Sequence, residues 1–219
     1  MPRQILPGQL TTAPLRTVRP LMLRDVYANP EKELVRLRQR GIVVRIAPGT
    51  YTAKPDTVAL AVDWRPPFEH AAMAYATAQY GDRVPVLFGI GAARLHHAIP
   101  RAIAVTVVAV PEQHRQVALA GGGLVIFTRA DVTALDARLE TVAIGVFLVT
   151  TPEQTLIDLM ARPGLGGMPD EARDAARTLA ARVDRDRVSA LVAPRPKTVQ
   201  QRVRHLLDQV PEHTARDQT

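Results

Sequence analysis

The chain has 219 residues, of which 47% are hydrophobic, so it can bury one or two cores without covalent staples. It contains no cysteine, which excludes disulfides, thiolate metal sites and a cysteine nucleophile. No apolar run reaches the length of a membrane span or a secretory leader, so we expect a soluble, unprocessed, cytoplasmic protein with no membrane partner.

The positive charge is concentrated at the N-terminal end of the chain. The formal net charge is +7, and residues 1–55 hold ten basic and three acidic side chains, so the remaining residues are balanced. A cationic segment joined to a neutral body is typical of nucleic-acid-binding proteins. The alternative interpretation is a basic segment that only keeps the protein soluble.

The basic unit is predicted to contain a helix followed at once by a β-hairpin. Asn29 is a favourable N-cap, Pro30 suits the first helical position, and Gly41 marks the end of the helix. The stretches 42–46 and 50–53 have high β-propensity and flank a Pro-Gly turn, which predicts two paired strands. The preceding segment, 15–27, is expected to be helical in part.

The predicted helix places apolar and basic residues on opposite sides. At 100° per residue, Leu34 and Leu37 face one way and can be buried. The outward stripe consists of Lys32, Arg36, Arg40 and the neighbouring Gln39. Like charges in a row repel one another, and an anionic partner would recover that cost. A solvated basic face is the alternative.

A two-residue turn at Pro48-Gly49 predicts which hairpin side chains share a face. The face expected to close on the helix holds Ile42, Val44, Ile46, Tyr51 and Ala53. The opposite face holds Val43, Arg45, Ala47, Thr50 and Thr52. We expect Arg45 and the two threonine hydroxyls to contact phosphates, because such groups commonly do so.

A basic helix followed by a two-stranded wing is typical of a winged helix-turn-helix, whose helix enters the major groove of duplex DNA. Residues 1–55 are therefore predicted to be a DNA-binding domain with double-stranded DNA as its partner. The expected contact residues are Lys32, Arg36, Gln39, Arg40, Arg45, Thr50 and Thr52.

Residues 56–219 predict a mixed C-terminal domain with a small β-sheet and several helices, which makes the chain α+β. Helices are expected at 66–80, 89–100, from Thr150 or Thr151 onward, and at 169–182, 184–192 and 197–209. Strands are expected at 102–110, 121–129, 138–144 and 145–150. The first strand is almost entirely apolar, which predicts that both of its faces are covered.

The body carries no recognisable enzyme motif, and we expect no catalytic, cofactor or metal site. His96 and His97 are adjacent, so on a helix their side chains point about 100° apart and cannot chelate together. Glu153 is expected to stabilise a helix N-terminus, and it lies on a different helix face from Asp158. A nuclease needs clustered carboxylates and a nearby lysine, and the body's only lysine, Lys197, has no acid close to it in sequence.

Three stretches of the sequence are similar to one known family. They are "ELVRLRQRGIVVRIAPGTY", "GIGAARLHHAIP" and, most specifically, "VFLVTTPEQTLIDLMARP", which looks like a strand followed by a TPxxTLxDLxxRP helix. On these stretches the chain resembles the AbiEi-type antitoxins, the regulator half of the AbiE toxin–antitoxin systems.

The resemblance implies a bacterial antitoxin that binds repeats in its own promoter and represses the operon. Its C-terminal domain is implied to counteract a partner toxin of the nucleotidyltransferase class. By position, the recognition helix is 30–40 and the wing is 42–53. The wing tip departs from the family, because Ala47 and Pro48 stand where a basic pair commonly precedes the glycine. The wing is therefore expected to hold phosphates less strongly than in a typical member.

Two other functions remain open at the level of the sequence. One is a stand-alone winged-helix transcription regulator whose C-terminal domain senses a ligand. The other is an enzyme of the nuclease type that acts on nucleic acid.

Overall fold

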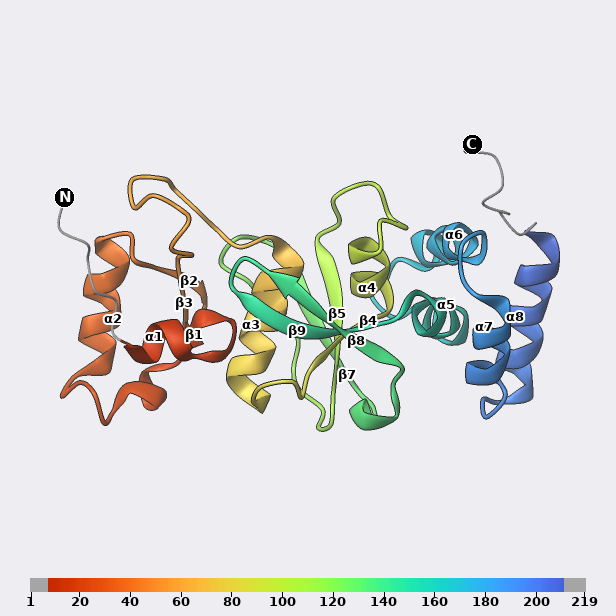
Figure 1. Cartoon of the computed structure of the whole chain (residues 1–219), viewed down its shortest axis with the longest axis horizontal. Helices are drawn as coiled ribbons and strands as arrows, with labels where there is room; N and C mark the ends of the chain where they lie inside the picture. Colours follow the sequence, from red (N-terminus) through yellow and green to blue (C-terminus); the bar gives the residue numbers. More distant parts are fainter. Residues whose placement is uncertain (1–7, 211–219) are drawn as a thin grey trace.

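The molecule is elongated, and its parts follow one another along the long axis (Figure 1). The computed structural model describes residues 8–210. A small N-terminal unit lies at one end, a β-sheet in the middle and a group of helices at the other end. The α+β class predicted from the sequence is confirmed.

The N-terminal unit begins with short elements and ends with a helix and a hairpin. In chain order it contains α1 (Gly8–Thr12), the 3-10 helix η1 (Pro14–Arg16), β1 (Thr17–Val18), the 3-10 helix η2 (Pro20–Leu23), α2 (Pro30–Gln39), β2 (Val43–Ala47) and β3 (Thr50–Ala53). The strands form an antiparallel sheet in the order β1-β3-β2. The helix starts as predicted, since the Asn29 side chain accepts a hydrogen bond from the backbone N–H of Lys32 at 3.0 Å.

A separate apolar core holds this unit together. It consists of Leu10, Val18, Leu23, Leu34, Leu37, Ile42, Val43, Tyr51 and Ala53. Leu34 and Leu37 attach α2 to the sheet through this core, as the spacing of the leucines predicts.

The predicted pairing of the hairpin is wrong by one residue along most of its length. The residues next to the turn pair as expected, but a β-bulge follows, and Arg45 then pairs with Tyr51 rather than with Thr52. Because side chains alternate along a strand, a slip of one residue exchanges the two faces. Val43 therefore packs into the core beneath α2, and Val44 packs against the body instead.

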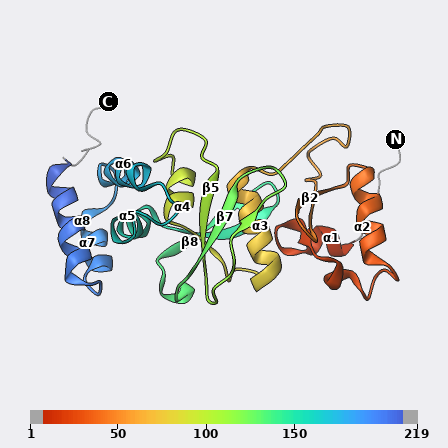
Figure 2. The same cartoon turned by 180° about the vertical axis from the view of Figure 1, so that it is seen from behind.

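The central sheet separates two layers of helices. Its strands are β4 (Val86–Phe88), β5 (Val105–Val110), β6 (Val117–Ala118), β7 (Leu124–Arg129), β8 (Ala137–Val142) and β9 (Gly145–Thr150), in the order β6-β7-β5-β4-β9-β8. The pairs β4–β9 and β5–β7 are parallel and the others antiparallel. Helix α3 (Phe68–Tyr80) covers one face, and α4 (Gly89–Leu95) and α5 (Pro152–Ala161) cover the other (Figure 2).

The apolar strand β5 is buried on both faces, as predicted. Val107 and Ala109 pack with α4 and α5, whereas Val108 and Val110 pack with α3. The neighbouring strand β4, which pairs with β5, was not predicted, because a strand of three residues is too short to show an alternation pattern.

The C-terminal part is a layer of helices. After α5 come α6 (Pro169–Ala180), α7 (Arg185–Val192) and α8 (Lys197–Gln209), at the predicted places. These three helices share one core with α4, α5 and the face of the sheet that α4 and α5 cover. A 3-10 helix, η3 (Val132–Ala134), precedes β8. Within the described residues, no helix combines the length and apolar character that crossing a lipid bilayer requires.

The N-terminal unit is docked on the body through buried side chains. Leu15, Ile46 and Ala47 belong to the same apolar core as α3 and the far face of the sheet. The connection that follows is also held in place, because Lys54 is only 4% exposed and its Nζ donates to the carbonyls of Leu60 and Val62. The boundary after residue 55 remains a prediction.

Candidate nucleic-acid interface

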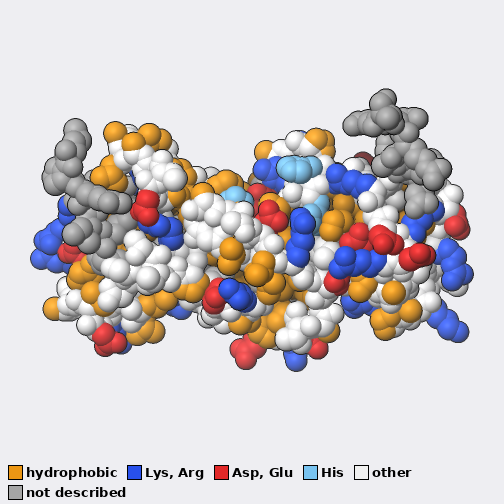
Figure 3. Space-filling view, viewed as in Figure 1, with side chains coloured by type: hydrophobic (Ala, Val, Ile, Leu, Met, Phe, Trp, Pro, Cys, Tyr) orange, Lys and Arg blue, Asp and Glu red, His pale blue; other side chains and the backbone are white. Residues whose placement is uncertain are grey.

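The outer side of α2 is basic and exposed. Leu34 and Leu37 are buried, and the predicted stripe of Lys32, Arg36, Gln39 and Arg40 is fully on the solvent side. Basic side chains are visible at this end of the molecule in the space-filling view, as they are at the opposite end (Figure 3). The helix therefore presents its cations and one amide side by side, which is the arrangement that the sequence predicted.

A carboxylate partly neutralises this surface. Arg36 Nη1 lies 3.0 Å from Glu33 Oε2, one turn earlier on the same helix. The Arg36 side chain remains 59% exposed, so it can leave the carboxylate for another anion at little cost.

Val35 lies in the middle of the same face and was not predicted as a contact. It is 45% exposed, three residues after Lys32 and four before Gln39, a spacing that places all three on one face. An apolar side chain on a helix in the major groove can contact the methyl group of thymine. The helical spacing is the signal that identifies Val35, since it lies between Lys32 and Gln39 on the same face.

Of the expected hairpin contacts, only Arg45 is exposed. Its Nε donates to the carbonyl of Ala47 at 3.4 Å, which holds the stem of the side chain along the bulge. The exposed turn, Pro48-Gly49, has a positive φ of 65° at the glycine, a conformation that glycine adopts readily. The wing tip, which lacks the basic pair common in the family, is thus a tight turn without a charge.

The expectation that Thr50 and Thr52 face outward is wrong. Both side chains are 0% exposed, and the Thr52 hydroxyl hydrogen-bonds that of Thr17 at 2.8 Å in the interior. The reason is that both faces of the hairpin are covered, one by α2 and the other by α3 and η1. In this conformation the two hydroxyls cannot reach a phosphate.

The TPEQT motif forms a structural junction rather than an open site. Thr151 caps α5 by accepting from the backbone of Gln154, and its hydroxyl donates to Asp136 at 2.5 Å. Asp136 in turn pairs with Arg187 at the start of α7, at 2.7 Å. Glu153 lies in the first turn of α5, as expected, and accepts from the backbone N–H of Asp184. The motif therefore ties β9, α5 and α7 together.

Asp158, three residues after the TPEQT motif on α5, is a buried carboxylate. Its Oδ1 accepts from Gln154 Nε2 at 2.7 Å, and within the described part of the chain its Oδ2 has no hydrogen-bond partner. Burial raises the pKa of this carboxyl to about 7, and Gln154, Arg195 and Arg162 oppose the shift. The sequence showed the residue but not its burial.

The adjacent histidines point to different environments. His96 is buried and bonds the carbonyl of Thr150 through Nε2 at 2.7 Å, whereas His97 is exposed. Burial lowers the pKa of His96, which keeps the ring neutral. In residues 8–210, no three His, Asp or Glu side chains are grouped so as to hold a metal ion.

The fold and the basic surface define an α+β protein with a cationic N-terminal unit docked on a neutral body. The family model of the AbiEi antitoxin C-terminal domain matches residues 86–209, from β4 to the end of α8. Because this match covers more than half of the chain, the protein belongs to the AbiEi antitoxin family. Its role is accordingly that of an antitoxin in a toxin–antitoxin system.

A solved structure supports the fold over nearly the whole chain. The crystal structure of the Rv2827c protein from Mycobacterium tuberculosis is similar with a TM-score of 0.58 and 20% sequence identity, covering 90% of this chain and 72% of that chain. At this identity the similarity concerns the fold alone. No curated protein matches the sequence.

Proposed function

We propose that this antitoxin binds double-stranded DNA in the promoter of its own operon and represses transcription. The N-terminal unit acts as a winged helix-turn-helix, with α2 in the major groove and the β2–β3 hairpin on the adjacent backbone. The rest of the chain, residues 56–219, counteracts a nucleotidyltransferase-type toxin.

One observation carries the DNA-binding proposal. α2 buries its leucines and exposes an unbroken outer face in the unit that contains the whole positive excess of the chain. The contacts that we propose are Lys32, Val35, Arg36, Gln39 and Arg40 on α2, together with Arg45 on the hairpin. Arginine and glutamine read guanine and adenine edges, and the remaining cations neutralise phosphates.

The family supports an antitoxin rather than a stand-alone regulator. The part of the chain that would sense a ligand in a regulator is the part that the antitoxin model matches. The class of the toxin rests on the sequence resemblance.

The sharpest test compares two matched double variants in DNA binding. Arg36→Ala with Arg40→Ala removes two cations spaced four residues apart on α2. Arg173→Ala with Arg177→Ala removes two exposed arginines with the same spacing on α6, at the far end of the molecule. Both variants lose the same net charge, so only the position of the charge differs.

Fluorescence anisotropy on the promoter duplex upstream of the chain's own gene measures the outcome. Two lost base contacts at about 1–3 kcal/mol each predict at least about a 30-fold loss of affinity for the α2 variant. The α6 variant should bind as the unaltered protein does. Equal binding by both variants would remove α2 from the interface.

The toxin half of the proposal is tested in the same variants. When each is co-expressed with the toxin encoded in the same operon, both should restore growth, because neither change touches the body's core. Failure of the α2 variant alone to restore growth would mean that toxin neutralisation depends on the DNA-binding face.

A further inference from the structure

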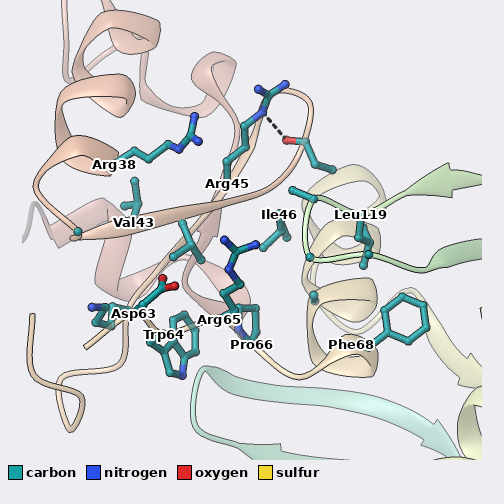
Figure 4. Close-up of a pocket in the computed structure, with 18 of the residues that line it drawn as sticks. Arg38, Val43, Arg45, Ile46, Asp63, Trp64, Arg65, Pro66, Phe68 and Leu119 are labelled. Atoms are coloured by element: carbon teal, nitrogen blue, oxygen red, sulfur yellow. Dashed lines mark hydrogen bonds between the residues drawn. The ribbon is translucent and has the colours of Figure 1, made fainter. Parts of the chain in front are cut away.

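A cleft lies where the N-terminal unit meets the body, and DNA binding leaves it unexplained. It has a volume of about 800 Å³ and is bounded by the end of α2, the strand β2, the segment 60–66 and the loop 118–122. Figure 4 shows that its lining side chains come from these separate segments. Small-molecule sites are commonly concave and of about this size.

The walls of the cleft are cationic. Arg38 extends from α2 and Arg65 from the connecting segment, both toward β2, which contributes Arg45 (Figure 4). Among the residues that the structure describes, Arg38 and Arg65 form no ion pair or hydrogen bond, and Arg45 bonds only a backbone carbonyl. Asp63 is the one carboxylate in the described lining, so the lining holds three guanidinium groups and a single negative charge.

Lys54 also lines the cleft, but its ammonium group is already hydrogen-bonded within the protein. Its Nζ donates to the backbone carbonyls of Ala59, Leu60 and Val62, at distances from 2.5 to 3.4 Å. This buried ammonium group fixes the connecting segment against the hairpin, and so holds Trp64 and Arg65 in place without a bound ligand.

The floor of the cleft is apolar and partly aromatic. Trp64 and Phe68, both half-buried, line the cleft together with Val43, Val44 and Ile46. A flat ring can stack on an indole, and arginine forks match the oxygens of a phosphate group. The aromatic surface and the arginine side chains line the same cavity.

We propose that this cleft binds a small organic anion that joins a phosphate group to a flat aromatic ring, the chemistry of a nucleoside monophosphate. The guanidinium groups of Arg38 and Arg65 hold the phosphate, and Trp64 receives the ring. The inference does not depend on DNA binding, because Arg38, Arg65 and Trp64 are not among the proposed DNA contacts.

The chain offers a built-in probe for this site. Trp64 is the only tryptophan in the sequence, so ¹⁵N-labelled protein gives one indole N–H signal, and that signal comes from the cleft. We expect AMP, GMP, CMP or UMP to shift it saturably in the full chain. Adenosine and ribose 5-phosphate, each with half of the chemistry, should bind at least about tenfold more weakly.

A pair of matched variants assigns the anion to the cleft. Arg65→Ala should weaken monophosphate binding at least about tenfold, a loss typical of one charged hydrogen-bonding group. Arg177→Ala, which removes an exposed arginine far from the cleft, should leave it unchanged. Equal loss in both variants would show a general charge effect and overturn the site.

Two further outcomes would also overturn the proposal. One is an indole signal that none of the four monophosphates moves at concentrations up to about 10 mM, beyond the millimolar range of weak specific binding. The other is a single-stranded decathymidylate that binds more tightly than every monophosphate and loses its affinity in Arg65→Ala. That result would make the cleft a path for a nucleic-acid strand.

Discussion

Glu33 sits beside the proposed DNA-contacting face, where its carboxylate would compete with DNA for Arg36. The pair is solvent-exposed on the arginine side, so it contributes little to stability. Glu33→Gln should therefore leave the fold unchanged and tighten promoter binding about two- to fivefold at low salt, an effect that fades as salt rises. Anisotropy titrations at two salt concentrations measure it. Weaker binding would mean that the ion pair orients Arg36 for its contact.

Asp158 predicts a pH dependence of stability. Its pKa of about 7 in the folded chain lies above that of an unfolded aspartate, near 4. Between these values the folded state retains a proton that the unfolded state has lost, so stability falls as pH rises toward 7, and the penalty is complete above it.

Asp158→Asn should remove that penalty. The amide oxygen can still accept from Gln154, and no charge is buried. At pH 8 the variant should be more stable than the unaltered chain by up to about 4 kcal/mol, and the advantage should shrink toward pH 5. Urea unfolding at the two pH values measures this, and the buried histidines cancel in the comparison. A less stable variant at pH 8 would show that Arg162 and Arg195 require the charged carboxylate.

At the scale of elements, the N-cap of α2 links local stability to the proposed function. Asn29→Ala removes the hydrogen bond to the first turn, which should cost about 1 kcal/mol and fray the end that carries Lys32. Promoter affinity should fall severalfold. Asp184→Ala removes the equivalent cap of α7 and should cost about as much in urea unfolding without altering DNA binding. Equal DNA affinity in both variants would contradict the role of the cap.

The positions of the long elements could be predicted because local chemistry specifies them. Asn29 and Thr151 cap their helices and a proline follows each of them, so α2 and α5 begin where the sequence indicates. The apolar run of β5 showed in the same way that both faces are covered. The short strands β1, β4 and β6 exist only through pairing with distant strands, and no local pattern contains that information.

The site was predictable on the helix but not on the hairpin. Spacing on α2 is enough to separate buried leucines from exposed cations. The burial of Thr52 depends on η1 and α3, which cover its face of the hairpin, and on Thr17, which lies 35 positions away in sequence. The burial of Asp158 and the cleft around Trp64 likewise arise where separate segments meet. The exposure of these side chains is therefore set by tertiary contacts, which no local sequence pattern contains.

At the scale of the whole molecule, the shared core predicts cooperative unfolding. Leu15, Ile46 and Ala47 pack with α3 and the sheet, so the N-terminal unit cannot unfold without exposing apolar surface of the body. Calorimetry should give a single transition. Ile46→Ala should lower its stability by about 2–5 kcal/mol, the usual cost of a buried cavity. Two well-separated transitions in the unaltered chain would mean that the units are independent.

If α2 binds DNA as proposed, the same docking of Leu15, Ile46 and Ala47 would fix the direction in which the body projects from the duplex. A DNA-binding unit on a flexible linker would let the body rotate, whereas here the orientation of the long axis would follow from the position of α2 in the groove. On an operator with two half-sites, the angle between two bodies around the duplex would follow the helical repeat of about 10–10.5 base pairs. Five extra base pairs would place the second body on the opposite side of the DNA. The distance between promoter repeats would thus determine which surfaces of neighbouring antitoxins can meet.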